Sequence, residues 1–212
     1  IIKAIREGLA ANEVEWIAGI LNGTTNYILT EMKENNLPFD TALQQAQDLG
    51  FAEADPTFDI EGVDAAHKIT ILASIAFGIP INFEAVHVEG ISSLSQKDIS
   101  YAEELGYRIK LLGIAKTDNS NVEIRVHPTL IPEKRLVANV DGPMNAVLVQ
   151  GNMVGPTLYY GAGAGAEPTA SAVAADIIDI ARQSMLSNKT LIPTLGFMPD
   201  KIHKKNILSI EN

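Results

Sequence analysis

The sequence predicts an α+β fold in which helices cover a mixed, largely antiparallel sheet. Strand patterns follow one another between residues 107 and 160 without a helix between them, which favours antiparallel or mixed pairing. Helical patterns, with apolar residues three and four apart, are concentrated before residue 105, and one more follows residue 167. The chain of 212 residues is long enough for one large domain or two small ones.

The first elements are a helix, a strand and a second helix. Residues 1–11 place Ile1, Ile5 and Leu9 on one face, as an amphipathic helix requires. The β-branched and aromatic residues of the segment 14–21 predict a strand. An Asn-Gly-Thr-Thr turn then leads into a helix over about 26–34, with Thr24 or Thr25 as its cap.

Two further helices are expected before residue 78. The first covers 39–48, and Gly50 is the residue that ends it. Pro56 stops any earlier helix, and Asp59 is a favourable N-cap for the second one. From about residue 60 the apolar positions recur at intervals of three and four, at Val63, Ala66, Ile69, Leu72, Ala73 and Ala76. This spacing predicts a long helix with one buried face.

The chain changes character after Gly78. Extended segments are expected at 79–83 and 86–88, followed by an exposed polar helix over 95–105. Strands are then expected in succession, at 108–116, 122–130, 146–150 and 153–160. The first two are joined by Thr-Asp-Asn-Ser-Asn at 117–121, a strong hairpin signal.

A glycine-rich turn contains Gly161, Gly163 and Gly165 and precedes a helix over about 168–182. A strand, Gly-x-Gly-x-x-Ala and a helix in this order have the form of a dinucleotide-binding fingerprint. Two features weigh against that interpretation. Few residues remain for further parallel strands, and no acidic residue ends a second strand about 20 residues later. The turn is therefore interpreted as a flexible connection that lets the helix pack on another part of the protein.

Composition excludes several classes of function. A formal net charge of −10 argues against nucleic acid or an anionic membrane as a partner, because both would require a basic surface. No run approaches the roughly 18 apolar residues of a transmembrane helix. The absence of cysteine excludes disulfides, thiolate catalysis and cysteine-ligated metal, and it fits a cytoplasmic protein.

Carboxylates are concentrated just before a single lysine. They are Glu53, Asp55, Asp59, Glu61 and Asp64, and the lysine is Lys68. Asp64 and Lys68 are four residues apart on the predicted helix, so their side chains share one face. A lysine can donate or accept a hydroxyl proton, and a carboxylate can orient its ammonium. The simpler interpretation is an ordinary exposed ion pair, worth only about 0.3–0.5 kcal/mol. The other carboxylates have no local counter-charge, which favours a cationic ligand.

Three segments resemble homoserine dehydrogenases. They are LGFAEADP…DIEGVDAAHK at 49–68, GILNGTTNYIL at 19–29 and GAGAGAEPTASAV at 161–173. The segments keep the order and rough spacing of the family and span most of the chain. The resemblance implies an oxidoreductase that interconverts L-homoserine and L-aspartate 4-semialdehyde, a step in the biosynthesis of threonine, methionine and isoleucine. It also implies NAD or NADP as cofactor and a small amino-acid substrate.

In this family a dinucleotide-binding domain precedes the matching region. Residues 1–187 are therefore expected to be the catalytic and dimerisation domain of a longer protein, whose cofactor is bound mainly by a domain absent from this sequence. The helix over 168–182 is expected to pack toward that domain, and 188–212 is expected to be an irregular tail or linker. The resemblance further implies a homodimer or a larger homo-oligomer, with contacts through the 107–160 sheet.

The resemblance also assigns roles to residues. Lys68 would transfer the hydroxyl proton and Asp64 would orient it, while Glu53 and Asp59 would hold the substrate ammonium. Gly23 and Thr24 would lie against the polar end of the substrate.

The glycine turn, with Gly161, Gly163 and Gly165, would lie near the nicotinamide end of the cofactor. No metal ligand is assigned within this sequence. Phe51 departs from the family, where tyrosine is frequent, so a hydroxyl contact there is expected to be missing.

Two other functions remain open at this point. One is a non-catalytic dimerisation or regulatory module with a degenerate site. The other is a divalent-cation-binding domain that uses the carboxylates between Glu53 and Asp64, although their spacing lacks the glycine and terminal glutamate of an EF-hand loop.

Overall fold

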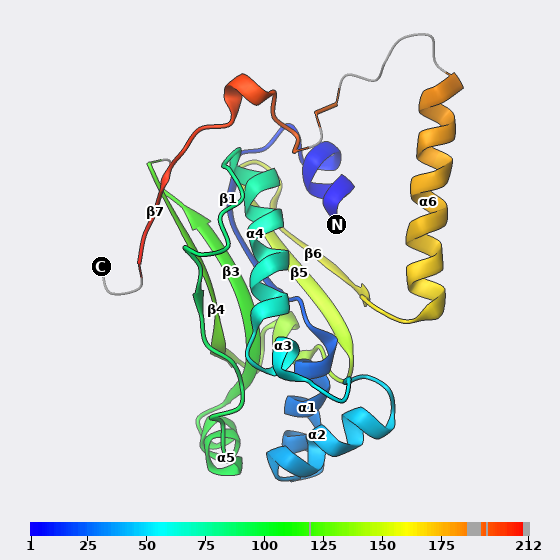
Figure 1. The fold of residues 1–212 in the computed structure, drawn as a ribbon. Coiled ribbons are helices and arrows are strands. Elements are labelled where there is room, and N and C mark those ends of the chain that lie inside the picture. The colour runs from blue at the N-terminus through cyan, green and yellow to red at the C-terminus, as the bar shows by residue number, and fades with distance from the viewer. Residues whose placement is uncertain (119, 186–191, 194, 210–212) are drawn as a thin grey trace.

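A computed structural model describes residues 1–212 apart from 119, 186–191, 194 and 210–212. Its centre is a seven-stranded sheet with helices on one face and at one end (Figure 1). The strands are β1 (Val14–Ile20), β2 (His87–Val88), β3 (Tyr107–Thr117), β4 (Asn121–Pro132), β5 (Met144–Gly151), β6 (Gly155–Ala162) and β7 (Asn206–Ile207). The predicted α+β class is confirmed.

The helices are α1 (Gly23–Glu34), α2 (Phe39–Asp48), α3 (Thr57–Ile60), α4 (Val63–Phe77), α5 (Gln96–Glu104) and α6 (Ala166–Met185). Shorter helical turns are η1 (Ala4–Gly8), η2 (Leu136–Asn139) and η3 (Pro199–Lys201). None of the helices in the described residues has the length and apolar content needed to cross a membrane.

The strand order is β2-β4-β3-β1-β5-β6, and β7 also pairs with β4. Strands β1, β3, β4, β5 and β6 pair antiparallel, whereas β2 and β7 run parallel to β4. The predicted hairpin joins β3 to β4, although residue 119 in its turn lies outside the described residues. Because β1 lies between β3 and β5, its end brings Leu21 and Asn22 to the middle of one sheet end.

Helix α4 packs across one face of the sheet and forms the main core (Figure 1). Ile69 of this helix is fully buried in one cluster with Ile17 and Val149 of the sheet, and each such side chain contributes about 1.5–3 kcal/mol. Gly113 of β3 permits the close approach, since a Cβ there would lie 3.1 Å from Ile69 Cβ and 2.8 Å from Leu21 Cδ1. This packing fixes α4 relative to the end of β1.

Helix α1 begins earlier than expected, and its N-cap differs from the prediction. Asn22 is the N-cap, with an extended backbone (φ −125°, ψ 122°) and a side chain that accepts a hydrogen bond from Thr25 N. Thr24 and Thr25, the predicted caps, lie inside the first turn.

The prediction of Asp59 as the N-cap of the long helix was also wrong. Asp59 lies in the one-turn helix α3, and α4 starts only at Val63. Gly62 separates the two helices with φ of +81°, a left-handed conformation that glycine adopts readily and other residues rarely do. The break places Asp59 and Asp64 on different helices.

Three other segments can be compared with their predicted structure. Residues 1–11 form only the short π-helical turn η1, in which Ile5 is buried while Ile1 remains exposed. Residues 79–83 form no strand, and only β2 pairs in that region. Residues 188–191, 194 and 210–212 of the predicted tail lie outside the described residues, and the rest of that segment contains η3 and β7.

Candidate active site

Asn22 joins the end of the central strand to two carboxylates. Its Nδ2 donates to Asp59 Oδ1 at 2.7 Å and to Asp64 Oδ2 at 3.0 Å. Its Oδ1 accepts from Thr25 N at 2.8 Å. The two donated bonds use both amide hydrogens, so Asn22 holds together two carboxylates that stand on different helices. Asn22 was not among the site residues predicted from the sequence, although an asparagine just before a helix start is a known N-cap signal.

Lys68 also bonds Asp64, at the same oxygen that accepts from Asn22. Its Nζ is 2.7 Å from Asp64 Oδ2 and 3.0 Å from Leu21 O. The predicted i,i+4 contact is therefore present, and the added bond to Leu21 distinguishes Lys68 from an ordinary surface ion pair. The Lys68 side chain is 51% exposed and that of Asp64 is 20% exposed. An ammonium has three hydrogens, and these two oxygens of the described chain leave one for a ligand.

Gly23 and Thr24 stand in the first turn of α1, beside Asn22. Thr24 is buried, and its Oγ1 donates to Phe51 O at 2.7 Å. The hydroxyl oxygen can still accept a hydrogen bond. Gly23 packs against the loop before β5, where a Cβ would lie 2.7 Å from Pro143 O. Gly23 therefore lets the backbone of α1 approach this loop.

The five carboxylates do not form one cluster. Only Asp59 and Asp64 are brought together, through Asn22. Asp55 accepts from Thr57 Oγ1 and N, and these bonds lower its pKa. Because the five carboxylates are dispersed, the alternative of a divalent-cation site is not favoured. Within the described residues, no three His, Asp or Glu side chains gather as a metal ion would need.

The other two carboxylates, Glu61 and Glu53, are not bonded to Asn22. Glu61 accepts from Ser92 Oγ at 2.6 Å. Glu53 is exposed, and its backbone carbonyl accepts from Gln47 Nε2.

A cleft of about 280 Å³ brings Lys68 to the glycine turn. Lys68, Asn145 and Gly163 provide its polar and backbone surfaces. The remaining walls are apolar and come from Ile1, Ile2, Leu21, Ile71, Leu72 and Val147. Residues 68 and 163, far apart in the sequence, therefore share one cleft.

Asn145, which lines this cleft, is a second functional residue that the sequence patterns did not indicate. Its Nδ2 donates to Ile20 O at 3.0 Å. Its Oδ1 packs against Gly163, where a Cβ would lie 2.1 Å away, so any larger residue at 163 would displace the amide. Gly161 has open space around it, and Gly165 has φ of +118°. Nothing in the sequence around Asn145 marked it, because its neighbours come from distant segments.

Comparison with known proteins gives the family. A model of homoserine dehydrogenases matches residues 1–178. The homoserine dehydrogenase of Pseudomonas aeruginosa is 59% identical over 211 residues, and that of Neisseria gonorrhoeae is 62% identical over the same length. A crystal structure of a homoserine dehydrogenase from Thiobacillus denitrificans has 63% sequence identity and a TM-score of 0.93, over 98% of this chain and 48% of that chain.

Each of these two matches covers 100% of this chain, but only 49% of the Pseudomonas relative and 48% of the Neisseria relative. The chain therefore spans about half the length of each. The fold and the relatives of the chain are those of dehydrogenases. More narrowly, it belongs to the homoserine dehydrogenase family. These matches do not favour a non-catalytic module or a cation-binding domain.

Proposed function

We propose that the protein containing this chain interconverts L-homoserine and L-aspartate 4-semialdehyde with NAD or NADP, as a step of amino-acid biosynthesis. The observation that carries the proposal is the position of the Lys68 amine. It is held by Asp64 and Leu21 O at the cleft that also contains Gly163. An amine fixed beside a cleft can exchange a proton with a bound alcohol or aldehyde.

Lys68 is the proposed proton-transfer group. In the reductive direction its ammonium donates a proton to the aldehyde oxygen as the alcohol forms, and in the oxidative direction the neutral amine accepts that proton. Asp64, at 2.7 Å, orients the amine, and Asn22 in turn fixes the carboxylate. The nicotinamide, when bound, accepts or supplies the carbon-bound hydrogen together with two electrons.

Carboxylates suit the other end of the substrate. Asp59 is held by Asn22, and Glu53 is exposed nearby in sequence, so both are proposed to bind the substrate ammonium. Thr24 Oγ and the backbone of Gly23, in the first turn of α1, are proposed to contact its polar groups. The free N–H groups and dipole of a helix start favour a carboxylate there.

The glycine turn is proposed to meet the nicotinamide end of the cofactor. This proposal is supported by the lining of the cleft, whose walls are mostly apolar. Gly163 lies so close to Asn145 that no side chain fits at that position. Gly161 and Gly165 are proposed to complete this contact.

The exposed apolar face of helix α6 is evidence for a second domain in the full-length protein. The helix stands away from the sheet (Figure 1), and its residues Val173, Ile177 and Ile180 are 53%, 62% and 63% exposed. Exposed apolar surface of this extent marks an interaction site. We propose that α6 packs on the domain that binds most of the cofactor.

The sheet face opposite α4 is the proposed dimer surface. Trp16 and Ala18 line a groove of about 570 Å³ there, and they alternate along β1 with Ile17, which packs in the main core. Leu136, at 75% exposure, and Leu158 of β6 also line it. A second copy would cover this apolar surface.

The proposed reaction is tested on the full-length protein with homoserine and either cofactor. Lys68→Ala should lower kcat at least about 10²-fold, as loss of a general acid–base group does. Lys97→Ala, on the exposed surface of α5, is the control for loss of a lysine. Absence of homoserine oxidation by the wild type refutes the reaction, and a near-normal kcat of Lys68→Ala refutes the role of Lys68.

A further inference from the structure

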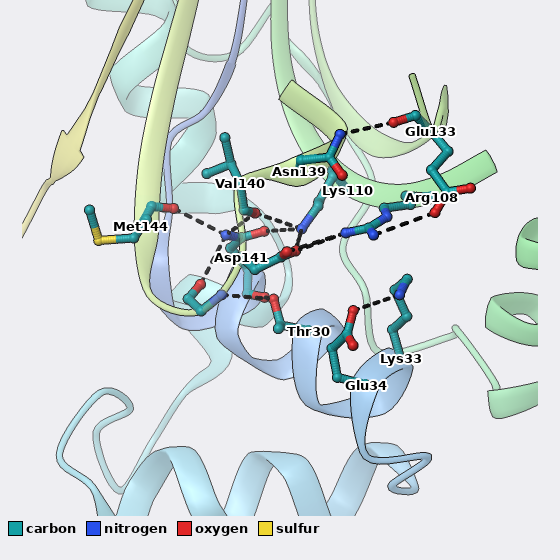
Figure 2. Close-up of polar contacts among 12 residues, drawn as sticks. Thr30, Lys33, Glu34, Arg108, Lys110, Glu133, Asn139, Val140, Asp141 and Met144 are labelled. Atoms are coloured by element: carbon teal, nitrogen blue, oxygen red, sulfur yellow. Dashed lines mark hydrogen bonds and ion pairs between the residues drawn. The ribbon is translucent and has the colours of Figure 1, made fainter. Parts of the chain in front are cut away.

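Lys110 of β3 is a buried lysine that the proposed reaction does not use. It is 2% exposed, and its Nζ donates to Val140 O at 2.7 Å, Asp141 Oδ1 at 3.0 Å and Asn26 Oδ1 at 3.1 Å (Figure 2). All three ammonium hydrogens therefore have acceptors. Burial lowers the pKa of Lys110, and the hydrogen bond and charge of Asp141 oppose this change. A charge is expensive to bury, so this arrangement calls for an explanation.

The contacts of Lys110 converge on the loop between η2 and β5. Asn26 Nδ2 lies 2.9 Å from Val140 O, 2.9 Å from Gly142 O and 3.1 Å from Met144 O. Gly142 N donates to Thr30 Oγ1 at 3.0 Å. The loop 140–144 is thus bonded to two successive turns of α1.

The same loop touches α1 at its first turn. A Cβ at Gly23 would lie 2.7 Å from Pro143 O, so the two backbones are in direct contact. Asn26 follows the N-cap Asn22 by one helical turn. The loop is therefore in direct contact with the start of α1, which holds Asn22 against Asp59 and Asp64.

The far end of the loop reaches the cleft. Asn145 follows Met144 directly, donates to Ile20 O and packs against Gly163. One short segment therefore bonds to Lys110, supports the first turn of α1 and continues into the wall of the cleft.

We propose that Lys110 is a positioning residue for the candidate active site, a role that rests on the proposed function. It acts through Asn26 and the loop 140–144, which set the position of the α1 start and hence of Asn22, Asp64 and Lys68. The hydrogen-bond partners of Lys110 include neither Lys68 nor any of the residues proposed to bind the substrate. A misplacement of about 1 Å at a catalytic group can lower a rate about 10²-fold, so a remote support can control turnover.

A purely structural role is the competing explanation. Replacement of a buried ion pair by apolar residues is often neutral or stabilising, so stability alone does not separate the two. Arg108 provides a matched control. Its Nη1 also bonds Asp141, at 3.2 Å, and its Nη2 lies 3.5 Å from Glu133 (Figure 2). Arg108→Met removes a cation from the same carboxylate but leaves the bonds of Lys110 to Asn26 and Val140 in place.

The experiment compares Lys110→Met with Arg108→Met in the full-length enzyme. We expect Lys110→Met to lower kcat/KM for homoserine at least about tenfold and to speed hydrogen exchange of the Thr25 amide, which the cap holds. Arg108→Met should do neither, even if it lowers thermal stability as much. Equal kinetics and equal exchange in the two variants overturn the proposal.

The two readouts separate this inference from the proposed reaction. If the wild type does not oxidise homoserine, the proposed function fails, and the exchange of Thr25 still decides whether Lys110 holds the start of α1. If Lys110→Met does not fold, Thr30→Val replaces it, since this change removes the bond from Gly142 N to Thr30 Oγ1. Thr30→Val should then lower kcat/KM and speed Thr25 exchange, and wild-type values of both overturn the proposal.

Discussion

Asn22 Nδ2 lies 2.7 Å from Asp59 Oδ1, across 37 positions of the sequence. The same nitrogen reaches Asp64, while the Oδ1 of Asn22 caps helix α1. One side chain therefore has two separable roles, a local one in the helix and a long-range one in holding two carboxylates. This separation can be tested directly.

Asn22→Ser should remove the long-range role and keep the local one. Serine is also a good N-cap, but its single short hydroxyl cannot donate to both Asp59 and Asp64. We expect thermal stability close to the wild type and a fall in kcat of at least about tenfold, because Asp64 would no longer be fixed beside Lys68.

Asn22→Ala is the companion variant. It removes the cap as well, so it should lose about 1 kcal/mol of stability in addition to the catalytic defect. Thermal unfolding and steady-state kinetics of both variants provide the measurements. If Asn22→Ser retained full turnover, the carboxylate bridge would have no catalytic consequence.

Glu53→Ala should mainly raise KM for homoserine. The proposed role of Glu53 is to bind the substrate ammonium equally in the ground and transition states, and loss of such binding leaves kcat little changed. Asp55→Ala is a matched control, because Asp55 is an exposed carboxylate two residues away that is engaged by Thr57. A rise in KM of the same size in both variants would assign the effect to net charge rather than to Glu53.

The local part of the candidate site could be predicted from the sequence, and the long-range part could not. The contact between Asp64 and Lys68 follows from a spacing of four residues on a helix. The helix break at Gly62 was missed because the apolar spacing continues from Ile60 into α4 without interruption. That break decides the position of Asp59.

Tertiary contacts explain the other omissions. Lys110 and Asp141 are 31 positions apart, and Asn145 meets Gly163 only after β5 and β6 have paired. The alternation of β3 gave no reason to expect a lysine at a buried position, since its partners come from α1 and from the loop before β5. The sheet class was predictable because adjacent strands in the sequence, β3 with β4 and β5 with β6, pair as hairpins.

Helix α5 should depend on pH through its N-terminal cap. Asp98 Oδ2 accepts from Ser95 Oγ at 2.6 Å and from Ser95 N at 2.8 Å, and these bonds lower the pKa of Asp98. A carboxylate with a lowered pKa stabilises the folded state above its ordinary pKa of about 3.9. That stabilisation is lost as the pH falls through the lowered pKa.

The measurement is the thermal midpoint of the wild type and of Asp98→Asn between pH 7 and pH 2. The wild type should be the more stable at neutral pH, and the difference should disappear at the acid end. Glu104→Gln, at the opposite end of α5, controls for the loss of a negative charge alone. A difference that stays constant down to pH 2 would mean that the Asp98 carboxylate does not stabilise this helix.

The open sheet face should control assembly. Leu136 is 75% exposed, and it lines the groove on the face opposite α4 together with Leu158, which packs on the smaller cluster of that face. Because specific dimers bury about 800 Å² on each partner with an apolar centre, Leu136→Asp with Leu158→Asp should convert a dimer to a monomer in sedimentation velocity. Leu105→Asp provides the control, since Leu105 is 72% exposed just beyond α5 and outside the groove. Dissociation by Leu105→Asp, or persistence of the dimer in the double variant, would place the interface elsewhere.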